Sequence, residues 1–130
     1  MVDIAPIMVI DNDVGMCALI DAILTDNGYS VVTFNSPYKA VAEIKNGNYS
    51  LVITDVKMPG MDGIQVLEHI KRFNKTIPVI LITAHATLDI SIQALRQGAD
   101  DMILKPFEAG ELLLRVNNVL KNNALYKENI

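Results

Sequence analysis

Five short runs of apolar residues, rich in β-branched side chains, are spaced along the chain. They cover residues 7–10, 31–34, 51–54, 79–83 and 102–104. Four of the five are almost continuously hydrophobic, which is the pattern of strands covered on both faces of a parallel sheet. The runs therefore predict five strands of one parallel sheet.

The segments between and after these runs carry helical spacing or helix boundary signals. Ser36, which precedes a proline, starts the second helix, and Thr87 caps the fourth, which stops at Gly98. Ile64 lies near the start of the third, and Glu108 favours the start of the fifth. The first helix has an expected buried stripe of Met16, Leu19, Ile20, Ile23 and Leu24.

Strands and helices thus alternate strictly along the chain. Right-handed crossovers between parallel strands then predict an α/β fold, a doubly wound five-stranded parallel sheet with five helices. In such folds ligands bind outside the carboxyl ends of the strands, at the point where the strand order reverses. The residues that follow the five strands are therefore the first candidates for a site.

Polar residues stand at four of those strand ends: Asp11-Asn12-Asp13, Asp55, Thr83-Ala84 and Lys105-Pro106. Carboxylate oxygens suit Mg²⁺, which is commonly held by one or two carboxylates plus waters and phosphate oxygens. A hydroxyl and an ammonium beside such a cation can neutralise and orient a phosphoryl group. The strand ends therefore predict a Mg²⁺-assisted phosphoryl site with an aspartate as nucleophile.

Composition narrows the function classes. The net charge of −4 argues against nucleic-acid binding by this domain, because such domains usually carry a basic patch. The one cysteine, Cys17, excludes a disulfide framework and a cysteine-based zinc site and suits a reducing cytoplasm. No apolar run is long enough to cross a membrane. The length of 130 residues is that of one domain, which we expect to be cytoplasmic.

Three segments resemble a known family. Residues 51–63, LVITDVKMPGMDG, are similar to the phosphoacceptor strand and loop of bacterial two-component response regulator receiver domains. Residues 78–84, PVILITA, and 98–107, GADDMILKPF, are similar to that family's fourth and fifth strands. The resemblance extends from about residue 5 to 121 and implies the flavodoxin-like fold of chemotaxis regulators. The aspartate followed by MPGMDG, with a distant KPF, is highly specific.

The resemblance implies a phosphoacceptor and a metal site. Asp55 would accept a phosphoryl group from a sensor histidine kinase or a phosphotransfer protein, with Mg²⁺ as cofactor. Asp11 and Asn12 occupy the positions of the family's metal-binding acidic pair, and Asp55 and the backbone carbonyl of Lys57 would be further ligands. The second acidic position is Asn12 here, so we expect the metal affinity to be reduced.

The resemblance also implies a switch. Thr83 would bind a phosphoryl oxygen, and Lys105, preceding an expected cis proline, would pair with the phosphate. Ala84 and His85, with Lys57, occupy positions that flank the phosphoryl group and tune its lifetime. The family usually has an aromatic residue where this chain has Met102, so we expect a looser switch.

The resemblance implies two kinds of partner, a kinase that supplies the phosphoryl group and a partner that binds the switched face. The face made by the helix after Thr87, the strand at 102–104 and the last helix would change its affinity for an output domain, a partner protein or a second copy. Residues 1–121 would form the receiver domain. Residues 122–130 would extend the last helix or begin a linker to an output domain, whereas a stand-alone regulator is the alternative.

Two other functions remain open on the residues alone. A degenerate receiver would bind partners without being phosphorylated. A haloacid-dehalogenase-like phosphatase would use Asp11 as nucleophile and Asp13 as general acid, but that family needs an acidic pair after its lysine, whereas Asp100 and Asp101 precede Lys105. Acetyl phosphate with Mg²⁺ separates the three, by an adduct on Asp55, an adduct on Asp11 or none.

Overall fold

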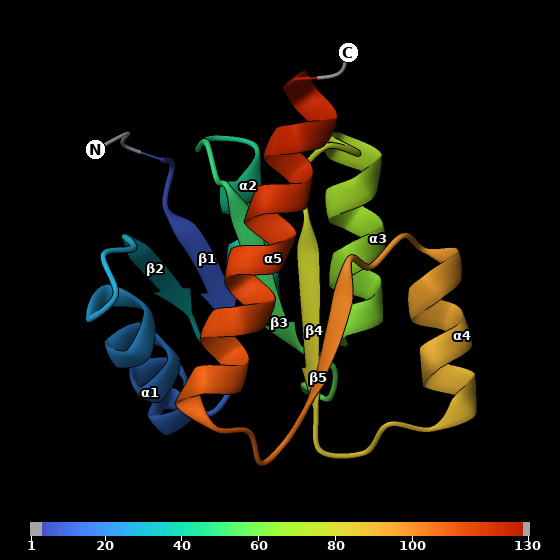
Figure 1. Cartoon of the computed structure of the whole chain (residues 1–130). Helices are drawn as coiled ribbons and strands as arrows, with labels where there is room; N and C mark the ends of the chain where they lie inside the picture. The colour runs from blue at the N-terminus through green and yellow to red at the C-terminus, as the bar shows by residue number, and fades with distance from the viewer. Residues whose placement is uncertain (1–3, 129–130) are drawn as a thin grey trace.

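The computed structural model of the chain describes residues 4–128 and contains one five-stranded parallel sheet (Figure 1). Its strands are β1 (Ile7–Ile10), β2 (Val31–Phe34), β3 (Leu51–Asp55), β4 (Val79–Thr83) and β5 (Asp101–Leu104). The order across the sheet is β2-β1-β3-β4-β5. The prediction of five parallel strands is confirmed, and two bounds differ by one residue because Asp55 and Asp101 belong to strands.

Five helices alternate with the strands, which confirms the doubly wound α/β fold. They are α1 (Val14–Thr25), α2 (Pro37–Ile44), α3 (Gly63–Phe73), α4 (Leu88–Arg96) and α5 (Ala109–Glu128). Ser36 and Thr87 cap α2 and α4 as predicted, each accepting a backbone N–H bond. Helix α5 continues to Glu128 without interruption, through most of the segment 122–130. Whether an output domain follows stays a prediction.

Helices cover both faces of the sheet. Helices α1 and α5 lie on one face, and α2, α3 and α4 lie on the other (Figure 1). The three central strands, β1, β3 and β4, are buried along their whole length, whereas the edge strands β2 and β5 are partly exposed. The prediction of four fully covered strands was therefore too high by one, because a sheet of five strands has two edges.

One residue of the predicted apolar stripe of α1 does not reach the core. Cys17, Ile20 and Leu24 are buried, at intervals of three and four residues. Leu19 is 48% exposed, so its assignment to the buried stripe was wrong. It lies one residue before Ile20, and adjacent residues on a helix face different directions.

The strand order reverses between β1 and β3. The chain leaves β1 for β2 on one side and later returns to β3 on the other side, so the carboxyl ends of β1 and β3 flank the switch point. In Figure 1 these ends lie at the bottom, and the last turn of α5 lies at the top, near the amino ends of the strands. Within residues 4–128, no helix combines the length and hydrophobicity needed to cross a membrane.

Candidate functional site

Two buried carboxylates lie side by side at the switch point. Asp11 follows β1 directly, and Asp55 is the last residue of β3. The register pairs Ile10 with Thr54, so the two aspartates stand at the same level of adjacent strands. Asp11 is only 2% exposed and Asp55 only 8%. Parallel pairing of two hydrophobic strands thus brings together two acids that are 44 positions apart in the sequence.

Lys105 reaches this pair from the loop after β5. Its ammonium lies 3.1 Å from Asp11 Oδ2 and 3.4 Å from Asp55 Oδ1. Its backbone N–H donates to the carbonyl of Thr83 at 2.8 Å, which ties the end of β5 to the end of β4. The Lys105–Pro106 peptide bond is cis, as the resemblance implies. Two carboxylates and one ammonium leave one negative charge in excess.

Burial and charge shift the ionisation of this cluster. Burial and the neighbouring charge of Asp11 raise the pKa of Asp55 above its ordinary value, although Lys105 opposes the shift. Burial lowers the pKa of Lys105, but its hydrogen bonds and charge interactions with Asp11 and Asp55 outweigh that effect. The net pKa of Lys105 is therefore raised, and the ammonium stays charged at neutral pH.

Thr83 ends β4 next to Asp55, but its hydroxyl is turned to the chain that follows. Asp55 pairs with Ile82 in the β3–β4 register, which places Thr83 one residue further along the neighbouring strand. The Thr83 hydroxyl accepts from the His85 N–H at 3.1 Å and donates to the His85 carbonyl at 3.3 Å. The predicted phosphoryl-binding hydroxyl is therefore at the site edge and bonded to the β4–α4 loop.

The other predicted site residues surround this cluster. Asn12, Lys57, Ala84 and His85 are exposed. Met102 is partly buried and packs against the core cluster under α2, α3 and α4. Its role in switching stays a prediction, as do the roles of Asn12 and Lys57 in metal binding and of Lys57, Ala84 and His85 in tuning.

Asp13 does not point into the site. Its Oδ1 accepts from the N–H groups of Gly15, at 2.9 Å, and Met16, at 3.4 Å, so it caps α1. Its own backbone N–H donates to Asp11 Oδ1 at 2.9 Å. A carboxylate committed to a helix cap is poorly placed to act as the general acid of the phosphatase alternative.

The loop between β3 and α3 is held close to Asp55 by a glycine. The N–H of Gly63 donates to the carbonyl of Val56 at 2.8 Å. A Cβ on Gly63 would lie 2.8 Å from Val56 Cα and would overlap the Asp55 carbonyl oxygen, so no other residue fits without displacing backbone. Asp62 caps α3 in a capping box with Gln65. The loop therefore leaves and rejoins the regular structure at fixed points.

The donor set suits a hard divalent cation. Among the residues that the structure describes, no three His, Cys, Asp or Glu side chains gather as a metal site. The carboxylates of Asp11 and Asp55 are the oxygen donors at the cluster. The Asn12 amide oxygen and the Lys57 backbone carbonyl are candidates for two further ligands. Oxygen ligands of this number leave positions for waters and phosphate oxygens, as Mg²⁺ prefers. The excess negative charge at the buried pair is what such a cation would neutralise.

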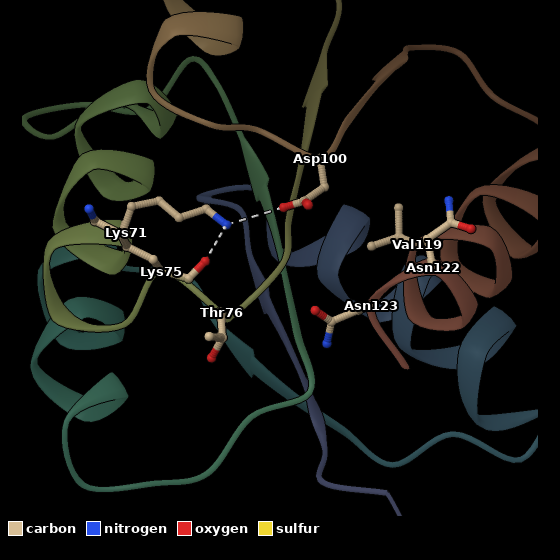
Figure 2. Close-up of a pocket in the computed structure, with 7 residues that line it drawn as sticks. All are labelled: Lys71, Lys75, Thr76, Asp100, Val119, Asn122 and Asn123. Atoms are coloured by element: carbon tan, nitrogen blue, oxygen red, sulfur yellow. Dashed lines mark hydrogen bonds and ion pairs between the residues drawn. The ribbon is translucent and has the colours of Figure 1, made fainter. Parts of the chain in front are cut away.

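One cavity opens beside the site and another lies far from it. A space of about 470 Å³ separates the β3–α3 loop from α4, and Met58, Ile64 and Ile90 are among its lining residues. A cavity of about 380 Å³ lies at the opposite edge of the sheet (Figure 2). There Lys71 donates to Asp100 at 3.2 Å and to the Lys75 carbonyl at 3.4 Å. These polar groups satisfy one another and tie α3 to the start of β5.

Two residues that lie next to the site were not predicted from the sequence to do so. The buried thiol of Cys17 donates to the Asp11 carbonyl at 3.3 Å, and the ring of Tyr38 lies over Gly60 in the β3–α3 loop. Helical spacing could have placed Cys17 on the buried stripe of α1. No sequence pattern indicates the contact between Tyr38 and Gly60, because α2 and that loop meet only in the folded chain.

With this geometry described, comparison with known proteins decides the family. A family model for the response regulator receiver domain matches residues 7–117. The chain belongs to the response regulator receiver family. It is therefore a receiver domain of the kind found in two-component systems, and its curated relatives include transcriptional regulators.

Individual relatives match this chain over most of its length. The chain is 35% identical to the transcriptional regulatory protein ZraR of Klebsiella oxytoca, over 92% of this chain and 27% of that protein. It is 32% identical to the DNA-binding transcriptional regulator NtrC of Klebsiella pneumoniae, over 88% of this chain and 24% of that protein. The chain thus spans about a quarter of the length of these relatives.

Solved structures agree with the fold. A CheY-like receiver domain protein of Methanospirillum hungatei has a TM-score of 0.92 and 27% identity, with 95% of this chain and 99% of that chain covered. NtrX of Brucella abortus has a TM-score of 0.89 and 33% identity, with 97% of this chain and 29% of that chain covered. The receiver-like fold and the family expected from the sequence are both confirmed.

Proposed function

We propose that this receiver domain accepts a phosphoryl group on Asp55 and uses it to switch a partner-binding face. The observation that carries the proposal is the buried cluster of Asp11, Asp55 and Lys105 at the switch point, with Lys105 within 3.4 Å of both carboxylates. An exposed acid would be an ordinary surface charge. A buried acid beside a second acid and one lysine can instead bind a cation, and the lysine can pair with a phosphoryl group.

The transfer itself is a displacement at phosphorus. A carboxylate oxygen of Asp55 forms a bond to the phosphorus of a phosphohistidine on the donor protein, and the phosphorus–nitrogen bond breaks. The electron pair of that bond goes to the imidazole, and Asp55 becomes an acyl phosphate. Bound Mg²⁺ would supply charge neutralisation for the transferring oxygens, held by Asp11, Asp55, the Lys57 carbonyl and Asn12.

Two residues of this chain would respond to the new phosphoryl group. Lys105, now paired with Asp11 and Asp55, is long enough to pair with a phosphoryl oxygen on Asp55 instead. Thr83 would exchange its bonds to His85 for a bond to the phosphoryl group. Each exchange would move a residue at the end of β4 or β5. These movements would couple phosphorylation of Asp55 to the position of α4.

Helix α4 is the least anchored helix of the fold. Ala94 is its one fully buried residue, and a cavity of about 470 Å³ separates it from the β3–α3 loop. Exposed apolar residues lie on α4 and on its neighbours in the proposed partner-binding surface: Leu88, Ile92 and Leu95 on α4, Leu104 on β5 and Leu114 on α5. A loosely anchored helix beside the site can adopt two positions, so this surface would change its affinity for a partner.

The relatives are more than three times as long as this chain, and α5 continues to Glu128. We infer that the partner of the α4–β5–α5 surface is an output domain, another protein or a second copy of this chain. A sensor histidine kinase or a phosphotransfer protein would supply the phosphoryl group.

Incubation with acetyl phosphate and Mg²⁺, followed by intact-mass and peptide analysis, tests the proposal. We expect a gain of one phosphoryl group on Asp55, and no adduct in Asp55→Asn, which retains the shape of the side chain but not the nucleophile. Asp13→Asn is the control, since asparagine also caps helices. An adduct on Asp11 would indicate the phosphatase alternative, and no adduct would indicate a degenerate receiver.

A further inference from the structure

Tyr38, on the first turn of α2, covers the tip of the β3–α3 loop. A Cβ built on Gly60 would overlap the Tyr38 hydroxyl oxygen and would lie 3.0 Å from Cε2 and 3.1 Å from Cζ, which is tighter than most real side-chain contacts. The ring therefore rests directly on the glycine backbone. Gly60 has a φ of +83°, a conformation that glycine adopts without strain. The glycine thus serves two purposes, the turn and the close approach of the ring.

The opposite side of this loop faces a cavity. The base of the loop is fixed by the bond from Gly63 to Val56, and Met58 is buried in the core. Towards α4, however, Lys57 and Pro59 line the open cavity of about 470 Å³. The tip is therefore covered on the α2 side by Tyr38 and is open on the α4 side.

Helix α2 provides a firm base for Tyr38. Ser36 caps it, and Pro37, Ala40 and Ile44 are buried. Tyr38 itself is 55% exposed, so little of its ring is used for core packing. Its hydroxyl oxygen and the adjacent edge of its ring both lie against Gly60, so the contact with the loop is made by the end of the side chain.

We propose that Tyr38 is a positioning residue for the metal site, holding the β3–α3 loop so that the Lys57 carbonyl points towards Asp55. The inference rests on the proposed function, because that function is what assigns the carbonyl to Mg²⁺. Lys57 lies three residues before Gly60 on the same short loop. A loop released at its tip samples more conformations and presents the carbonyl less often, so metal affinity falls.

The test compares four proteins: wild type, Tyr38→Ala, Tyr38→Phe and Phe73→Ala. Phe73 is the matched control, since it is an aromatic residue 46% exposed at the end of α3, outside this loop. The Mg²⁺ dissociation constant is measured by NMR titration of backbone amides. We expect it to rise about tenfold in Tyr38→Ala, the lower end of the effect of residues that orient metal ligands. Phe73→Ala should retain the wild-type value, and Tyr38→Phe, which keeps the ring contact but loses the hydroxyl contact, should weaken binding less than Tyr38→Ala.

Three results would overturn the proposal: wild-type affinity in Tyr38→Ala, equal weakening in Phe73→Ala, or equal weakening in Tyr38→Phe. Gly60→Ala gives an independent check. It should weaken Mg²⁺ binding by itself, and adding Tyr38→Ala should cause less than the sum of the two losses, because both disturb one contact. Additive losses would contradict the shared contact.

A measurement without metal separates this inference from the proposed function. Amide hydrogen exchange at Gly60 and Met61 in metal-free protein should be faster in Tyr38→Ala than in wild type and unchanged in Phe73→Ala. If the exchange rates behave so but wild type takes no phosphoryl group, Tyr38 still orders the loop and the proposed function fails. If wild type is phosphorylated on Asp55 and the exchange rates do not differ, the inference alone fails.

Discussion

The Lys105 ammonium lies nearer to Asp11, at 3.1 Å, than to Asp55, at 3.4 Å. The lysine expected to pair with a phosphate is thus shared between two acids in the unphosphorylated chain. All three side chains are largely buried, so their charges interact strongly. The cluster is one positive charge short of neutrality.

Asp55→Asn should stabilise the metal-free protein at neutral pH. The pKa of Asp55 is raised by burial and by Asp11, so the folded state binds this proton more tightly than the unfolded state does. Protonated Asp55 therefore contributes to the stability of the fold at low pH. This contribution is lost as the pH rises through the pKa that Asp55 has in the folded state. Asparagine carries no charge to desolvate and keeps Lys105 paired with Asp11.

Thermal melts in EDTA between pH 4 and 8 would check this. The melting temperature of Asp55→Asn should exceed that of wild type at pH 7, and the difference should shrink as the pH falls. Mg²⁺ should reduce the difference at pH 7, because the cation stabilises the wild-type site. A lower melting temperature of the variant at pH 7 in EDTA would show that ionised Asp55 stabilises the fold.

Lys105→Ala should destabilise the metal-free protein by about 3 kcal/mol, since it leaves two adjacent carboxylates without their cation. Mg²⁺ should still bind and should restore much of the loss. The beryllofluoride-induced spectral shift should be smaller than in wild type, because the coupling residue is gone. Urea unfolding with and without Mg²⁺ measures the first two effects.

Lys71→Ala is the matched control for that variant. It breaks a lysine–aspartate pair of similar geometry, 3.2 Å from Asp100, at the opposite edge of the sheet (Figure 2). Its loss of stability should not depend on Mg²⁺. Equal rescue of both variants by Mg²⁺ would mean that the cation acts on the whole fold and not on the Asp11–Asp55 pair.

The sequence was sufficient to place Asp11, Asp55, Thr83 and Lys105 at one edge, because parallel strands in a doubly wound sheet bring their carboxyl ends together. It was not sufficient for the direction of the Thr83 hydroxyl. That direction depends on a local bond to His85, and several rotamers fit the same strand.

Two further features could not be predicted for related reasons. The exposure of Leu19 depends on how α1 is rotated over the sheet, which one hydrophobic residue does not determine. The contact of Tyr38 with Gly60 joins α2 to a loop 22 positions away in sequence. Hydrophobic periodicity describes one helix or strand at a time, so it does not predict which residues of different elements come into contact.

Asn12→Asp should tighten Mg²⁺ binding by about 1 kcal/mol, or roughly fivefold, at the effective dielectric of a partly exposed site. Asn12 is exposed at the site edge, and a carboxylate there would add a negative charge beside the cation. Asp13 cannot readily supply that charge, since it caps α1 through Gly15 and Met16. Isothermal titration of Mg²⁺ measures the change.

Asp13→Asn serves as the control for Asn12→Asp. Asparagine retains the helix cap and removes a charge two residues from Asp11. Its Mg²⁺ affinity should change little. A larger loss in Asp13→Asn than the gain in Asn12→Asp would show that Asp13 leaves the cap and ligates the metal.

Met102 should give this domain a looser switch than an aromatic residue would. Its side chain packs partly buried against the cluster under α2, α3 and α4, on the strand next to Leu81 of β4. Methionine is unbranched and repacks among several rotamers, so it can follow a movement of Thr83 at little steric cost. A tyrosine would have to bury or expose a large amphipathic ring, which separates the two states in energy.

The free protein should therefore already sample the active arrangement. Relaxation-dispersion NMR should detect exchange in α4, whose one fully buried residue is Ala94, and beryllofluoride should shift the same amides towards one end of that exchange. Met102→Tyr should reduce the minor population, while Leu114→Tyr, on the exposed face of α5, should leave it unchanged. An absence of exchange in the free protein, followed by a large shift with beryllofluoride, would mean that methionine separates the two states as sharply as a ring does.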